Sequence, residues 1–404
     1  MKTAGRWFLG TLAASGLLAA AAISGCSGFW DAPPNGGGGG TNPASGNFYV
    51  LNQKTAQIAG FAFAAGASSP TALTGSPYAL GTLPNCIAID PTGSFLYVGT
   101  ATGGILLYTI SSNGALTAST GGAISSDPAN AMQVDPTGSW LVESVSGTGI
   151  LTAIPLNSTT GGNNGAAVTV NLPATTLQQI AISPSISGTT SYAFVAMGTG
   201  GTAVVPFNSG NSNPFGTVQR ITVKHNLGAA NAVGVDPQNR LLYVGETAAA
   251  TGSQSGGLRA FTIGSSSVTE ITSGATDITG TAYPYSTGGT GPSSILPTSS
   301  AVYVSNSAVS GNSTGNITGF KILTSASGNT FSLASINTVT TGTQTTGLAI
   351  DSTSSYLLAV NFGGNPDLST FTFDTTTAGQ LDVGPTAATG ADPAGAWAIA
   401  AAPQ

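Results

Sequence analysis

The stretch Ile87–Ile110 reads IAIDPTGSFLYVGTATGGILLYTI and decides the fold, because it encodes three short strands joined by tight turns. The IAI and FLYVG segments are rich in β-branched and aromatic residues, which suit a pleated, buried surface. Between them, DPTG (90–93) predicts a type I turn, since Asp bonds the backbone ahead, Pro fixes φ and Gly suits the fourth position. Two glycines (103–104) lead into ILLYTI, and an Asn-Gly turn (113–114) leads to an outer strand over ALTAST. The segment therefore predicts one four-stranded antiparallel sheet.

This unit repeats along the chain, as it must if each sheet is to bury its faces against similar neighbours. The pattern of the second strand recurs seven times, as NFYVLN (47–52), SFLYVG (94–99), SWLVES (139–144), SYAFVA (191–196), RLLYVG (240–245), SAVYVS (300–305) and SYLLAV (355–360). The third strand recurs as IAGFAF, ILLYTI, ILTAIPL, AVVPFN, LRAFTI, ITGFKI and STFTFD. The first strand recurs as IAID, MQVD, IAIS, VGVD, a shortened SIL near 295, LAID and AWAIA. Spacings of roughly 40–60 residues are typical of propeller blades.

The two ends of the repeat region complement each other. The first copy of the second strand, Phe48–Asn52, has no first strand before it, and the last first strand, Ala396–Ala400, has no second strand after it. Pairing the two would complete a blade and leave only short, protected sheet edges. The sequence therefore predicts an all-β, seven-bladed β-propeller of four-stranded antiparallel blades, closed by the C-terminal strand.

The N-terminal segment reads as an export signal, with Lys2 and Arg6 ahead of a short apolar run. Ile23-Ser24-Gly25-Cys26 resembles the lipobox of bacterial lipoproteins, which implies lipidation at Cys26 and an outer-membrane or cell-surface location. An ordinary signal peptide and a transmembrane helix are the alternatives. We expect a signal peptide over 1–25, a Gly/Pro-rich tether over 26–46 and the propeller over 47–404.

Charge is sparse: charged residues make up 5% of the chain. Removing Lys2 and Arg6 with the signal leaves six basic against fourteen acidic residues. This balance argues against nucleic-acid binding, which needs a basic footprint. With Cys26 lipidated, Cys86 has no disulfide partner and reads as a small buried hydrophobe rather than a catalytic thiol.

The blade DPTGSFLYVG, with IAI before it and G-x-L-x-x-Y after it, resembles the seven-bladed lactonase-type propellers. These include 6-phosphogluconolactonases of that fold and surface-layer YVTN-repeat proteins. The resemblance covers residues 47–404 and implies the fold strongly and the reaction weakly. It implies, for an enzyme, hydrolysis of a lactone ring by a cluster of Arg, His and Glu at one channel mouth.

Charged residues that could form such a cluster lie in the fourth and fifth blades. Candidate catalytic residues are His225, Glu246, Arg220 and Arg259. His225 and Glu246 fall in two kinds of loop that share one face of a propeller, so they could meet. The alternative is that these are scattered surface charges, and Arg240 on the opposite face is expected to be a solvated charge.

The first strands share a polar entry residue, namely Asn85, Asn130, Gln178 and Asn231. Amides ringing a channel mouth could bind a neutral ligand such as a sugar, or they could cap strand ends. No metal-ligand spacing and no cofactor motif is present. Two hypotheses follow: a lipid-tethered binding or scaffold module for a protein or glycan partner, and an extracytoplasmic lactonase.

Overall fold

The structure, a computed structural model, describes residues 46–403 except 65–66, 146, 222–227, 248–256, 266, 272–283, 310–312, 329 and 391–392. The regular structure in these ranges is all strand, and hydrogen bonds join the described strands into six antiparallel sheets. Within the same ranges no helix is long and apolar enough to span a membrane. The all-β prediction is confirmed.

The first three sheets each have four strands in a row. Sheet 1 contains β29 (Ala396–Ala401), β1 (Gly46–Asn52), β2 (Gln57–Phe63) and β3 (Thr71–Ala72), with β4 (Tyr78–Ala79) also on β2. Sheet 2 contains β5 (Pro84–Ile89), β6 (Phe95–Thr100), β7 (Ile105–Ile110) and β8 (Leu116–Ala118). Sheet 3 contains β9 (Ala129–Val134), β10 (Trp140–Val145), β11 (Ile150–Pro155) and β12 (Val168–Asn171).

The remaining sheets continue the pattern. Sheet 4 contains β13 (Gln179–Ile182), β14 (Tyr192–Ala196), β15 (Thr202–Pro206) and β16 (Gln219–Arg220). Sheet 5 contains β17 (Ala230–Val235), β18 (Leu241–Glu246), β19 (Gly257–Ile263) and β20 (Val268–Ile271), with β21 (Tyr285–Ser286) on β19. Sheet 6 has seven strands: β22 (Thr290–Pro297), β23 (Ala301–Ala308), β24 (Thr314–Thr324), β25 (Phe331–Ile350), β26 (Tyr356–Gly364), β27 (Leu368–Phe373) and β28 (Leu381–Ala387).

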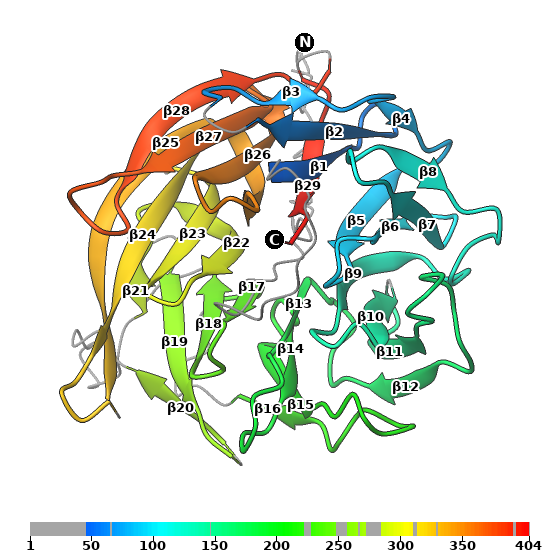
Figure 1. The fold of residues 1–404 in the computed structure, drawn as a ribbon. Helices are drawn as coiled ribbons and strands as arrows, with labels where there is room; N and C mark the ends of the chain where they lie inside the picture. The colour runs from blue at the N-terminus through cyan, green and yellow to red at the C-terminus, as the bar shows by residue number, and fades with distance from the viewer. Residues whose placement is uncertain are drawn as a thin grey trace, which may run out of the picture.

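The sheets are arranged around a central axis (Figure 1), and each contributes an inner strand, except that sheet 6 contributes two, β22 and β25. These inner strands touch in succession: β29 contacts β5, β5 contacts β9, and the series continues through β13, β17 and β22 to β25, which contacts β29. The C-terminal strand β29 pairs antiparallel with β1, with Val50 opposite Ile399. The predicted partners therefore lie side by side.

Buried aspartates organise the turn that follows the inner strand, at Asp90, Asp135, Asp236 and Asp351. In sheet 2 the Asp90 carboxylate accepts from the backbone N–H of Ser94 at 2.8 Å and of Phe95 at 2.7 Å. Gly93 has φ of +69°, which an L side chain rarely adopts. The carboxylate thus satisfies backbone donors that the tight turn would otherwise bury unpaired.

Aromatic side chains on the second strands hydrogen-bond to loop carbonyls far away in sequence, which lie in the next sheet except for one bond within sheet 6. The Tyr49 hydroxyl donates to the carbonyl of Gly114 at 2.7 Å, and Tyr97 donates to Gly161 at 2.9 Å. Four more bonds of this kind run from Trp140 to Ser209, Tyr192 to Gly264, Tyr303 to Gly379 and Tyr356 to Ala67. Each bond buries a ring while satisfying its polar end.

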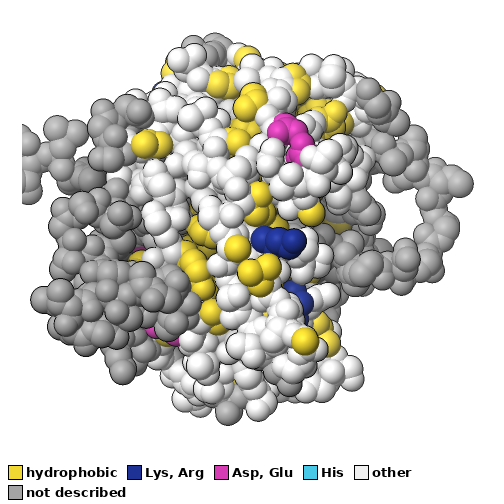
Figure 2. All heavy atoms as spheres, turned by 90° about the vertical axis from the view of Figure 1, so that its left-hand side faces the viewer, with side chains coloured by type: hydrophobic (Ala, Val, Ile, Leu, Met, Phe, Trp, Pro, Cys, Tyr) yellow, Lys and Arg dark blue, Asp and Glu magenta, His cyan; other side chains and the backbone are white. Residues whose placement is uncertain are grey.

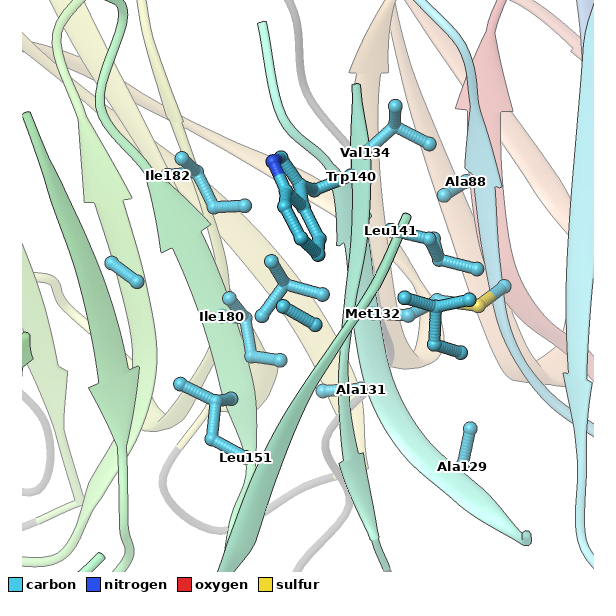
Figure 3. Close-up of a cluster of buried hydrophobic side chains, with 14 of the residues drawn as sticks. Ala88, Ala129, Ala131, Met132, Val134, Trp140, Leu141, Leu151, Ile180 and Ile182 are labelled. Carbon is cyan, nitrogen blue, oxygen red and sulfur yellow. The ribbon is translucent and has the colours of Figure 1, made fainter. Parts of the chain in front are cut away.

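The core lies between neighbouring sheets rather than inside one (Figure 3). Trp140, Ile180 and Ile182 pack on one side of β10, whereas Met132 and Leu141 pack on the other. Both faces of a sheet are therefore buried, which explains strand segments that are apolar almost throughout.

One detail of the predicted strand pattern is wrong. The inner strand near 295 is not shortened, because β22 covers Thr290–Pro297. A side view of the molecule shows few Lys, Arg, Asp or Glu side chains among mostly uncharged atoms (Figure 2), in line with the composition.

Candidate functional site

A β-bulge recurs at the beginning of the inner strands. Strand pairing skips one residue there in six of them, and the skipped residues are Asn85, Asn130, Asn231, Ser293, Thr346 and Trp397. Gln178 immediately precedes β13 at the corresponding position. A bulge turns its extra side chain out of the regular alternation of the strand. We call these seven residues the bulge ring.

Four members of the bulge ring donate a hydrogen bond to the inner strand of the next sheet or to a residue at most two positions before it. Asn85 Nδ2 donates to the carbonyl of Ala129 at 3.2 Å, and Trp397 Nε1 donates to that of Asn85 at 2.7 Å. The same arrangement runs from Asn130 to Leu177 at 3.5 Å and from Thr346 to Ala396 at 3.3 Å. Each of these bonds ends at or within one residue of the next ring position. The ring residues therefore lie close together, at the end of the central axis where the inner strands begin.

Two carboxamides of the ring differ from this pattern. Gln178 is 4% exposed and Asn231 is 7% exposed. None of their amide atoms is among the fully buried side-chain atoms that lack a partner, so these amides are not buried unsatisfied groups. An amide that is not used by its own inner strand can hydrogen-bond water or a ligand.

The predicted residues Glu246 and Arg259 do meet. Glu246 ends β18 and Arg259 lies on β19, and Arg259 Nε donates to Glu246 Oε2 at 2.8 Å. Arg259 Nη1 also donates to Glu270 Oε1 on β20 at 2.6 Å. Burial raises the pKa of Glu246, and the guanidinium opposes that rise. Burial alone would lower the pKa of Arg259, but the two carboxylates outweigh it and raise the pKa.

This arrangement limits what Arg259 can do chemically. Its guanidinium is buried and already faces two carboxylates, so it carries no spare positive charge for an anionic substrate or an oxyanion. Arg220 lies on the outermost strand of sheet 4 and is exposed. His225 lies outside the described residues. The structure thus joins two of the four catalytic candidates to each other, together with Glu270, which the sequence reasoning did not name.

Arg240 is not the solvated charge that we expected. Its Nε lies 2.7 Å from Asp236 Oδ2, so it pairs with the buried aspartate of its own turn.

Glu143 is a second buried carboxyl that the sequence reasoning missed. It is 0% exposed on β10; Ser125 Oγ donates to its Oε1 at 3.2 Å, and its Oε2 has no partner among the described residues. Burial raises its pKa to about 7. The signal was present in the sequence, because the aligned position of FLYVG and RLLYVG holds Val98 and Val244.

An aromatic pair and a lysine adjoin the ring at Trp397. The rings of Phe362 and Trp397 meet edge to face with centroids 5.4 Å apart, and Lys54 Nζ lies 4.8 Å from the centre of the Phe362 ring. Lys54 Nζ also donates to the Phe362 carbonyl at 3.4 Å. This end of the ring thus offers partly exposed aromatic surface beside the ring amides.

No group of three or more His, Cys, Asp or Glu in the described ranges is placed to hold a metal ion.

The fold is similar to that of several solved β-propellers. A candidate 6-phosphogluconolactonase from Bacteroides fragilis superposes with a TM-score of 0.64 at 15% identity, over 90% of this chain and 99% of that one. A candidate 6-phosphogluconolactonase from Bacteroides uniformis gives 0.62 at 16% identity, over 84% and 95%.

A periplasmic gluconolactonase from Pseudomonas aeruginosa has the same architecture, with a TM-score of 0.56 at 14% identity over 84% of this chain and 94% of that one. No family model and no curated protein matches the sequence. At these identities the likeness establishes the fold and leaves the reaction to be argued from the site.

Proposed function

We propose that this chain is an exported, lipid-anchored binding module whose propeller presents the bulge ring to an uncharged polar ligand or partner. One observation carries the proposal: the seven ring positions are uncharged, and four of them are carboxamides gathered at one end of the inner strands. Carboxamides that face no protein group can hydrogen-bond hydroxyl and carbonyl groups of a ligand. The Trp397–Phe362 pair adds apolar surface beside them.

The proposal includes a closed ring of seven blades. Sheet 6 is interpreted as two blades that share β25, whose twenty residues serve first as an outer and then as an inner strand. The pairing of β29 with β1 supports closure. The bond from Tyr356 to Ala67, which joins sheet 6 to sheet 1, also supports it.

The anchor and the location are proposed from the sequence. Cys26 would carry the lipid, residues 26–46 would tether the propeller, and the protein would reside on the outer membrane or cell surface. Metabolic labelling with a radioactive fatty acid tests this. The wild type should be labelled and sediment with membranes, and Cys26→Ser should lose both properties.

The ring is tested with Gln178→Met and Asn231→Leu in the mature chain carrying Cys26→Ser. Replacing either amide by an apolar group of similar size removes no buried hydrogen bond that holds the fold, so stability should change little. We therefore expect both variants to fold normally and to lose binding to at least one member of a neutral-glycan array, while glycans bound elsewhere on the molecule are retained. If the wild type binds no glycan on the array, or if both variants bind as the wild type does, the ring is not the binding site.

An extracytoplasmic lactonase is the second candidate. The names of the Bacteroides and Pseudomonas propellers favour it. The neutralised Arg259 argues against an anionic lactone as substrate. Lactone hydrolysis by the purified mature protein tests it, with His225→Ala and Glu246→Gln expected to abolish turnover. Absence of wild-type turnover across neutral and acidic sugar lactones removes this candidate.

A further inference from the structure

Two loops of sheet 4 enclose a groove at the end of the sheet opposite the bulge ring. One loop, 183–191, joins β13 to β14, and the other, 207–218, joins β15 to β16. The space between them measures about 620 Å³. Gln178 lies at the start of β13 and this groove at its end, so the two sites lie at opposite ends of the strand.

The first loop departs from the turn used elsewhere in the fold. In sheet 2 the corresponding connection covers only 90–94, organised by Asp90. Sheet 4 has Ser183 in place of the aspartate, and the Tyr192 N–H donates to Ser183 Oγ at 2.7 Å. The Ser183 hydroxyl thus joins the end of β13 to the start of β14, and the longer loop between them forms one wall of the groove.

Both walls are fixed by the neighbouring sheets. Asn239 Nδ2, from sheet 5, donates to Thr189 Oγ1 and to the Thr190 carbonyl, each at 3.1 Å. From sheet 3, Trp140 Nε1 donates to the carbonyl of Ser209 at 2.9 Å. The rings of Phe207 and Phe215 meet edge to face at 5.8 Å beneath the second loop. A site whose walls are already held in place loses little entropy when a ligand binds.

The chemistry of the walls is uncharged and rich in donors. No Lys, Arg, Asp or Glu is among the described residues that line the groove. Asn208 Oδ1 accepts from the Gly210 N–H at 3.1 Å, and Asn213 Oδ1 accepts from the Phe215 N–H at 3.0 Å. The oxygens of these exposed amides are thus used by their own loop, which leaves both Nδ2 groups as donors toward the groove.

Apolar surface lies beside these donors. Ile186 is 36% exposed on the first loop, and Phe215 is half-buried on the second. Aromatic and aliphatic groups next to a few fixed polar groups are the usual composition of a small-molecule site, and such sites measure about 300–1,000 Å³.

We propose that this groove binds an uncharged saccharide. A sugar offers hydroxyl oxygens to the two Nδ2 donors and apolar C–H faces to Phe215 and Ile186. A phosphate or carboxylate ligand would find no cation in the described lining. The groove is a binding site separate from the bulge ring and does not depend on the function proposed for it.

The test is calorimetric titration of the mature chain carrying Cys26→Ser with neutral tetrasaccharides of glucose and of N-acetylglucosamine. Asn208→Asp combined with Asn213→Asp keeps both Oδ1 acceptors, and therefore the loop, while removing the two donors. We expect the wild type to bind at least one saccharide and the double variant to bind at least about tenfold more weakly.

Asn157→Asp is the matched control. Asn157 Oδ1 accepts from the Thr159 N–H at 2.9 Å in the corresponding loop of sheet 3, away from the groove. It should bind like the wild type, as should Gln178→Met with Asn231→Leu. The proposal is overturned if no tetrasaccharide binds, if the double variant binds normally, if Asn157→Asp weakens binding equally, or if the ring variants abolish it.

Discussion

Sheets 3 and 5 each bury a glutamate on their second strand, and the two glutamates are treated in opposite ways. Glu246 in sheet 5 faces a guanidinium that bridges it to Glu270. Glu143 in sheet 3 receives one hydroxyl hydrogen bond, from Ser125. The second strand of a repeated unit therefore holds a compensated charge in one case and, at a position two residues earlier in the repeat, an almost uncompensated carboxyl in the other.

The difference teaches that a buried carboxyl has two routes to a tolerable free energy. It can keep its charge beside a cation, at the risk of a large loss when that cation is removed. It can instead bind a proton, because desolvation penalises the charged form and raises the pKa. The predictions below separate these routes.

The largest effect is expected from Arg259→Met. The change leaves the Glu246 carboxylate buried and the Glu270 carboxylate unpaired, which should lower the free energy of unfolding by about 3–5 kcal/mol. Urea denaturation at pH 8 measures it.

Two controls define that result. Glu246→Leu, Arg259→Met and Glu270→Leu together should restore most of the stability, because apolar groups replace all three charges. Arg240→Met removes a partly exposed guanidinium and should cost less, about 1 kcal/mol, because the Asp236 carboxylate still accepts from the backbone N–H of residue 240 and of Leu241. Equal losses for Arg259→Met and Arg240→Met would contradict the contrast between a buried and a partly exposed arginine.

The same residues show which features of the fold and of the candidate site could be predicted from the sequence. The alternation of strands, the DPTG turns and the pairing of the chain ends could be predicted, because they depend on local patterns and on a repeat. Four ring amides could be named from their place before the first strands. Ser293, Thr346 and Trp397 occupy the same place but were missed, because their residue types differ and only the bulge shows that they are equivalent.

The partners of the charged residues were the weaker part of the prediction. The pair of Arg240 with Asp236 was missed, although the two residues are only four apart in sequence. Glu270 lies on β20, and its contact with Arg259 on β19 depends on the register of these two strands. Register is a property of the folded sheet that spacing alone does not determine.

The second prediction concerns pH. Glu143 has a pKa of about 7 in the folded protein against 4.5 for an ordinary glutamate. The folded state therefore binds the proton more tightly than the unfolded state. Its contribution to stability should grow as pH falls below about 7 and be complete below about 4.5, with a total of about 3 kcal/mol.

Comparison of the wild type with Glu143→Gln by urea denaturation from pH 8 to pH 4.5 isolates this contribution. The difference in unfolding free energy should favour Glu143→Gln at pH 8 and shrink as the pH falls. A difference that is constant across the range would mean that Glu143 keeps its charge when folded.

The smallest predicted effect concerns two buried tyrosine hydroxyls, one with a hydrogen-bond partner and one without a partner among the described residues. The Tyr303 hydroxyl donates to the Gly379 carbonyl at 2.8 Å, whereas the buried Tyr243 hydroxyl, at the equivalent position of sheet 5, has no partner among the described residues. Tyr303→Phe should therefore cost about 1 kcal/mol, and Tyr243→Phe should be neutral or slightly stabilising, because it removes an unsatisfied polar group. Urea midpoints of the two variants measure both. A comparable loss in Tyr243→Phe would show that this hydroxyl has a partner outside the described ranges, and the connection between adjacent sheets would then be the same at both positions.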